Sequence, residues 1–171
     1  MPTITNPLRL EVLKRMTLVL EEINPADGYV HDLSAKVFRG RGLFWDETPL
    51  PALSILEAPI PLDQIPSAKD NVAQSGPWEL VVQGWVADDR QNPTDPAQIL
   101  LADVKRRLAL EKRKVDWDRA EEGIFGLGRF VTAMHIGPGV VRPPEEISSK
   151  AYFWLTITLD IAEDMANPYE V

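Results

Sequence analysis

The chain has 171 residues, 44% of them hydrophobic, which is enough for one domain with a substantial core. Its formal net charge of −8 argues against a general nucleic-acid-binding protein, because phosphate contacts need clustered excess Lys and Arg. The chain has no cysteine, which excludes a disulfide framework, a thiolate zinc site and a thiol nucleophile. No stretch approaches the ~18 consecutive apolar residues of a membrane span, so we predict no membrane association.

Residues 7–23 are predicted to form an amphipathic helix. Asn6 is placed at its N-cap and Pro7 at its first position, a combination typical of helix starts. The helix should end before Asn24-Pro25, because proline disfavours helical geometry in the residue that precedes it. The residues at helical spacing that are expected to face the core are Leu8, Val12, Leu13, Met16, Val19, Leu20 and Ile23.

Two short strands are predicted in the next part of the chain. Residues 33–39 alternate in polarity, and residues 52–57 form a second strand that is entered through prolines. Between them, residues 40–48 are rich in glycine and irregular, which indicates a hairpin tip or a loop. The side chains expected to point inward from the two strands are Leu33, Ala35, Val37, Leu53 and Ile55.

A strand followed by a helix is predicted between residues 78 and 113. Residues 78–86 alternate with a period of two, which is typical of a strand. The helix is expected to start with Asp95 at the N-cap, Pro96 at the first helical position and Gln98 completing a capping box. The residues of its buried face are predicted to be Ala97, Leu101, Val104 and Leu108.

Residues 130–136 and 152–161 are predicted to form the last two strands. The second would span about 33 Å at ~3.3 Å per residue, and its continuous apolar character places it inside a sheet. One side of it would carry Phe153, Leu155, Ile157, Leu159 and Ile161, and the other Tyr152, Trp154, Thr156, Thr158 and Asp160.

These elements predict a single α+β domain over residues 1–171, with two layers. Two amphipathic helices would cover one face of a mostly antiparallel sheet of about five strands. Long Pro- and Gly-rich loops at residues 40–51, 58–77 and 137–150 would protrude from it. Three aromatic residues on the other face indicate that a loop or a neighbouring molecule covers it: Trp85, Tyr152 and Trp154.

No residue pattern predicts catalysis, a cofactor or a metal. His31 and His135 lack a triad-like arrangement with Ser or Cys, and His135 is expected to be a hydrogen-bonded structural residue of a strand. Acidic residues at 116–122 are more typical of a solvated loop than of a calcium site. A basic cluster at the end of the second helix either complements the helix dipole or contacts an acidic protein: Lys105, Arg106, Arg107, Lys112, Arg113 and Lys114. DNA binding is a third interpretation, disfavoured because the rest of the chain is strongly acidic.

The order of elements resembles that of the tail terminator (tail completion) proteins of long-tailed bacteriophages. The resemblance lies in the N-terminal helix, the proline-led strand at 50–55, the strand and helix at 78–108, and the aromatic strand that begins at 152–155. It implies a structural virion protein, present in the host cytoplasm during assembly, that forms a ring, typically a hexamer, at the head-proximal end of the tail tube. There it would end tube polymerisation and provide the surface for head-tail joining, with no catalytic residue and no cofactor.

The partners implied are further copies of the chain, the tail tube protein, and a head-tail connector or neck protein. DNA would only pass through the channel, where an acidic lining would repel it. A ring needs two different contact patches on each subunit. The candidate contact residues are Phe44, Trp45, Arg106, Lys112, Arg113 and Trp154. The alternatives are another neck component such as a connector or head-closure protein, a minor tail protein, or a small ligand-binding module.

Overall fold

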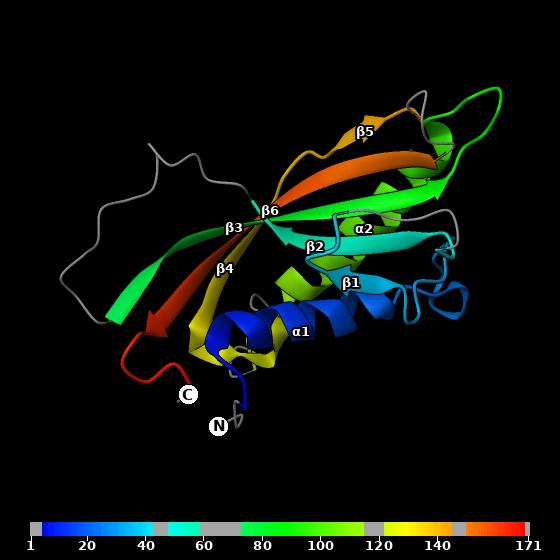
Figure 1. Cartoon of the computed structure of the whole chain (residues 1–171). Coiled ribbons are helices and arrows are strands. Elements are labelled where there is room, and N and C mark those ends of the chain that lie inside the picture. The colour runs from blue at the N-terminus through cyan, green and yellow to red at the C-terminus, as the bar shows by residue number, and fades with distance from the viewer. Residues whose placement is uncertain (1–4, 43–47, 59–72, 115–121, 145–149, 170–171) are drawn as a thin grey trace, which may run out of the picture.

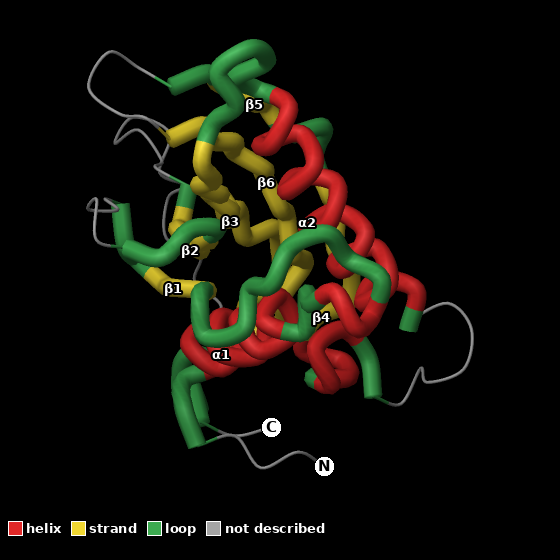
Figure 2. The backbone as a smooth tube through the Cα atoms, turned by 90° about the vertical axis from the view of Figure 1, so that its right-hand side faces the viewer, coloured by secondary structure: helices red, strands yellow, loops and turns green. Residues whose placement is uncertain are grey.

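A computed structural model describes residues 5–42, 48–58, 73–114, 122–144 and 150–169 (Figure 1). It confirms the predicted α+β class: two helices form one layer and a six-stranded, mostly antiparallel sheet forms the other. Figure 2 shows the sheet on one side of the second helix, with loops and short turns around the helical layer. The buried side chains between the two layers make one continuous core.

The helices are α1 (Leu8–Glu21) and α2 (Asp95–Arg113). Short 3₁₀ turns are η1 (Pro25–Asp27), η3 (Ile124–Gly126) and η4 (Gly128–Phe130). The strands are β1 (Val37–Arg39), β2 (Ala52–Glu57), β3 (Ala73–Ala87), β4 (Val131–Ile136), β5 (Val140–Arg142) and β6 (Lys150–Asp164).

The strand order is β1-β2-β3-β6-β4, and β5 pairs with the part of β6 that β4 does not reach. The long strands β3 and β6 lie antiparallel along their full 15 residues and form the centre of the sheet. As predicted, β6 is an interior strand, and its inward residues Phe153 to Ile161 are buried. Gly84 lies opposite Phe153, and the ring covers it so closely that a side chain there would overlap the ring.

Both predicted helices exist, but both predicted caps are wrong. Pro7 is the N-cap of α1, and the side chain of Asn6 instead donates to Glu11 at 2.9 Å. Thr94 is the N-cap of α2 and makes no side-chain cap bond. The N–H of Asp95 already donates to the carbonyl of Asn92 at 3.1 Å, so the chain turns before Asp95 and no capping box forms. The predicted buried faces of the two helices are confirmed, apart from the half-buried Leu13 at the edge of the core.

The predicted strand at residues 33–39 is shortened to β1. Ala35, expected to point inward, is exposed and has a φ of 56°, a left-handed conformation that a strand cannot contain. β1 and β2 are parallel, so the segment that joins them is not a hairpin. Residues 43–47, which include Phe44 and Trp45, lie outside the described residues.

Two of the predicted loops contain strand residues. β3 begins at Ala73, so residues 73–77 of the expected 58–77 loop belong to it, and residues 59–72 lie outside the described residues. Pro77 is tolerated because, among the described residues, β2 pairs with residues 80–85 of β3 and does not reach the Pro77 position. Within the expected 137–150 loop, β5 pairs with β6, and Lys150 is already part of β6.

Candidate functional site

The face of the sheet that the helices leave uncovered carries an apolar groove of about 520 Å³. Strand register explains its composition, because Leu56, Val81 and Thr156 lie opposite one another, as do Gln83, Trp154 and Val140. "The groove" below means this hollow, lined by Leu56, Glu57, Val81, Gln83, Pro138, Gly139, Val140, Trp154 and Thr156.

Trp154 and Val140 give the groove its exposed apolar surface. Trp154 is 39% exposed and Val140 46% exposed. The Trp154 ring lies 5.5 Å from that of Tyr152, which in turn lies 5.0 Å from Trp85. Of the three aromatic residues predicted to point outward, Tyr152 is buried and Trp85 is half-buried, so Trp154 is the one that remains available to a partner.

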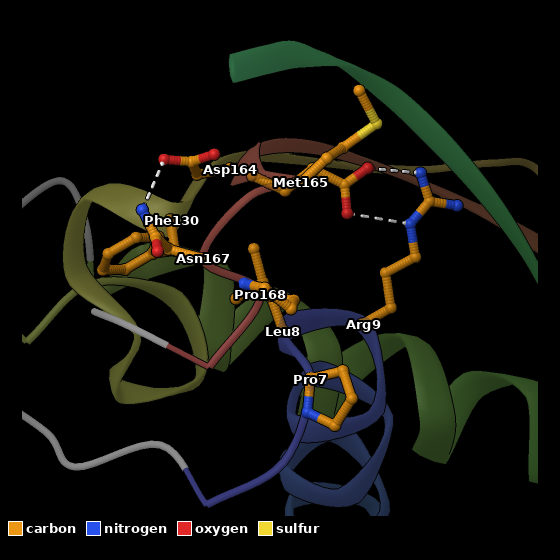
Figure 3. Close-up of a pocket in the computed structure, with 9 residues that line it drawn as sticks. Pro7, Leu8, Arg9, Phe130, Asp164, Met165, Asn167 and Pro168 are labelled. Atoms are coloured by element: carbon orange, nitrogen blue, oxygen red, sulfur yellow. Dashed lines mark hydrogen bonds and ion pairs between the residues drawn. The ribbon is translucent and has the colours of Figure 1, made fainter. Parts of the chain in front are cut away.

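A second hollow, of about 300 Å³, lies where the start of α1 meets the end of β6 (Figure 3). Arg9 makes two hydrogen bonds to Glu163, of 2.7 and 3.2 Å, and its guanidinium lies 5.1 Å from the centre of the Trp78 ring. Because the carboxylate of Glu163 accepts these bonds from the charged guanidinium, it raises the pKa of Arg9 above its ordinary value. The N–H of Leu8 donates to the carbonyl of Pro168 at 3.2 Å. These contacts join the two ends of the domain, so this hollow is a structural junction.

Several members of the predicted basic cluster bind groups of their own domain. Lys105 donates to the carbonyl of Pro138, which ties the turn before β5 to α2. Arg106 donates to the carbonyl of Gly28 at 2.6 Å and stacks over the Tyr29 ring at 4.6 Å. Both side chains therefore help to hold connecting segments against α2.

Glu111 is the centre of a buried polar network that was not predicted from the sequence. Its side chain is 1% exposed and accepts from the N–H of Phe125 at 3.0 Å. Lys114 approaches it at 2.7 Å and Arg107 at 3.5 Å, and Arg107 also pairs with Glu22. The signal was present in the sequence, because Glu111 follows Leu108 by three residues and so continues the buried stripe of α2.

Both histidines have identifiable surroundings. Nδ1 of His31 lies 2.9 Å from Oδ2 of Asp103, which also accepts from the backbone N–H groups of Val30 and His31. His135 lies in β4, as predicted, but its side chain is exposed and lies 3.8 Å from Asp160, whereas the sequence predicted a hydrogen-bonded structural residue. The alternation of β4 turns it toward the helix-free face. No group of three potential metal ligands occurs among the described residues, and most of the acidic segment 116–122 lies outside them.

The outward side of α2 combines exposed apolar and charged residues. Ile99 is 45% exposed and Leu110 is 43% exposed. At ~100° per residue, six exposed residues fall within about 80° of arc. "The outer stripe" below means these residues: Asp95, Ile99, Ala102, Arg106, Leu110 and Arg113.

Lys112 and Arg113 are the two predicted contact residues at the end of α2 that point to solvent. Both are exposed, and within the described part of the chain neither has an ion-pair partner. Arg113 belongs to the outer stripe, whereas Lys112 lies to one side of it. Two apolar, partly charged surfaces therefore exist, one on each layer of the domain: the groove and the outer stripe.

No protein-family model matches the sequence, and no curated protein matches it either. Neither described helix has both the length and the apolar composition that a membrane crossing requires. The function is therefore inferred from the order of the elements and from the two surfaces.

Proposed function

We propose that this chain is a structural protein of a long-tailed bacteriophage that forms a ring, typically a hexamer, at the head-proximal end of the tail tube. The ring ends tube polymerisation and provides the surface to which the head-tail connector or neck protein binds. The observation that carries the proposal is that the elements resembling tail terminator proteins (α1, β2, the β3–α2 unit and β6) all contribute to one core.

The two surfaces on opposite layers support self-association into a closed ring. A cyclic assembly uses heterologous interfaces, in which one patch of a subunit binds a different patch of the next. The groove and the outer stripe are such a pair, because they differ in shape and lie on different layers. The net charge of −8 also suits a channel through which DNA moves without adhering.

The proposal is tested with purified tail tube protein from the same phage. Tubes polymerised with the chain present are expected to stay short and to carry it at one end only, as seen by gold labelling of a tagged copy. Antibody against the chain is expected to label virions at the junction of head and tail. Tubes that grow equally long with and without the chain, or label at the distal tip, would contradict the proposal.

A second candidate is a ligand-binding module, and the volume of the groove is the observation that favours it. Small-molecule sites usually enclose ~300–1,000 Å³, a range that includes the groove. Such sites also bring a few polar groups together around the ligand, whereas the groove is mainly apolar and half-open around Trp154. A saturable thermal shift with a small molecule, abolished by Trp154→Ala, would favour this candidate over the ring.

A further inference from the structure

We propose that the groove binds the outer stripe of α2 from a second copy of this chain. The inference rests on the proposed function, because it identifies the two patches through which the subunits of the ring would meet. The neighbour's α2 would run along the sheet in the same direction as β6, with its C-terminal end toward Glu79 and its N-terminal end toward Arg142.

The width of the groove fits one helix. Its outermost lining residues are on β2 and β5, and β3 and β6 lie between these two strands. Three strand spacings of ~4.8 Å separate β2 from β5 by about 14 Å. A helix with its side chains is ~10–12 Å across, so one helix can lie over β3 and β6 between these lining residues. Helix-in-groove docking of this kind is a common mode of recognition.

The charges at the two ends of the groove are complementary to those of the outer stripe. Glu79 and Arg142 are both exposed on the helix-free face, and neither has an ion-pair partner in the described ranges. On the outer stripe, Arg113 occupies the C-terminal end of α2 and Asp95 the N-terminal end. Placing Arg113 near Glu79 brings Asp95 toward Arg142, so opposite charges meet at both ends.

The spacing of these charges agrees in the two elements. Arg142 lies in the cross-strand row of Trp85, which is six residues from Glu79 along β3, or about 20 Å. Asp95 and Arg113 are 18 residues apart on α2, or about 27 Å at ~1.5 Å per residue. The long side chains of the two arginines can span the difference of about 7 Å.

The same placement sets apolar residues against apolar residues. Leu110 is about 4.5 Å from Arg113 along the helix axis, which positions it over the row of Leu56 and Val81. Ala102, about 16 Å from Arg113, falls close to the row of Trp154, and its small side chain leaves room for the indole. The outer stripe therefore matches the groove in width, charge and apolar content.

α1 is the other helix with exposed leucines, Leu10 and Leu18. Between them on its outer side lies Lys14, whose ammonium group is already bound to the side chain of Asn6 at 2.9 Å. The last turn of α1 has no basic residue. α1 therefore lacks a free cation at its C-terminal end to meet Glu79, and α2 is the helix that the groove fits.

Disulfide cross-linking tests the inference directly, because the native chain has no cysteine. Leu110→Cys and Thr156→Cys are introduced in one chain, since Thr156 is exposed in the row over which Leu110 is placed. Oxidation in the presence of tail tube protein is expected to give a ladder of cross-linked multimers. Each subunit carries one cysteine on the outer stripe and one in the groove, so it can form a disulfide with each of its two neighbours. The matched control is Leu18→Cys with Thr156→Cys, which moves the cysteine to an exposed leucine of α1 and should give no ladder.

Charge reversal supplies a second readout in the same assay. Glu79→Arg and Arg113→Glu are each expected to weaken self-association at least about threefold, and the combined variant should recover most of the loss. A ladder equal to that of the control, or charge reversals that do not rescue each other, would overturn the inference. Tube capping retained without a ladder would leave the proposed function intact, whereas a ladder without tube capping would support the interface and contradict the proposed function.

Discussion

Gly84→Ala is expected to destabilise the domain by about 2 kcal/mol through overpacking. A methyl group built at this position lies 2.1 Å from Cε1 and 2.4 Å from Cζ of Phe153. Contacts this short cannot persist, and Phe153 is fully buried in the core, so its ring can move only by displacing other core side chains. The free energy of unfolding, measured by urea denaturation at pH 7, checks the value.

A matched control and a double mutant separate overpacking from other effects of the substitution. Gly76 is in the same strand, and a methyl group there meets no atom within 4 Å. Gly76→Ala should therefore leave stability unchanged or raise it by up to about 1 kcal/mol. Combining Gly84→Ala with Phe153→Leu, which removes the clashing ring atoms, should destabilise less than the sum of the two single changes. A loss below about 0.5 kcal/mol for Gly84→Ala, or strict additivity in the double mutant, would refute the reasoning.

Three further predictions concern buried charge, pH and assembly. Glu111→Ala should lower the free energy of unfolding by about 3 kcal/mol, because it leaves the N–H of Phe125 without an acceptor and the buried guanidinium of Arg107 with Glu22 alone. Exposed Gln98→Ala is the control, and equal urea midpoints would contradict this expectation. Burial raises the pKa of Glu11, but hydrogen bonds from Arg15 and Asn6 lower it below its ordinary 4.5. The stabilisation that ionised Glu11 provides should therefore be present above pH 4.5 and be lost as the pH falls below it. In urea titrations, the free energies of unfolding of the native protein and of Glu11→Gln should become equal at low pH. A difference between them that does not change with pH would argue against this expectation. Trp45→Ala should weaken assembly in light scattering while leaving the monomer melting temperature nearly unchanged; a large drop would place Trp45 in the subunit core.

Local patterns were sufficient to predict the main elements of the fold. The alternation of β6 and the apolar stripes of α1 and α2 are encoded by neighbouring residues, so their existence and buried faces could be read from the sequence. The antiparallel sheet with two helices on one face followed from these elements.

Features that depend on distant residues could not be predicted in the same way. The parallel pairing of β1 with β2 is set by tertiary contacts, and the strand character of residues 73–77 arises because β6 pairs with them despite Pro77. The helix starts were misplaced because the first N–H groups have backbone acceptors. The N–H of Leu8 donates to the carbonyl of Pro168, which is distant in the sequence, and the N–H of Asp95 donates to the carbonyl of Asn92.

The candidate site was predicted only in part. Trp154 was predicted as a contact residue from the aromatic face of the sheet, and Arg113 from the basic cluster at the end of α2. Both are exposed in the structure. The groove itself could not be predicted, because it depends on the register that sets Leu56, Val81 and Val140 beside Trp154. Arg106 was predicted as a contact residue, but its guanidinium is already engaged with Gly28 and Tyr29.

An electron cryomicroscopy reconstruction of the junction between head and tail would show both the ring and the contacts between its subunits. We expect a closed ring of this chain on the last tube layer, in which α2 of each subunit lies in the groove of the next. Density at that position that belongs to another protein, or a single copy whose groove encloses a small molecule, would contradict it.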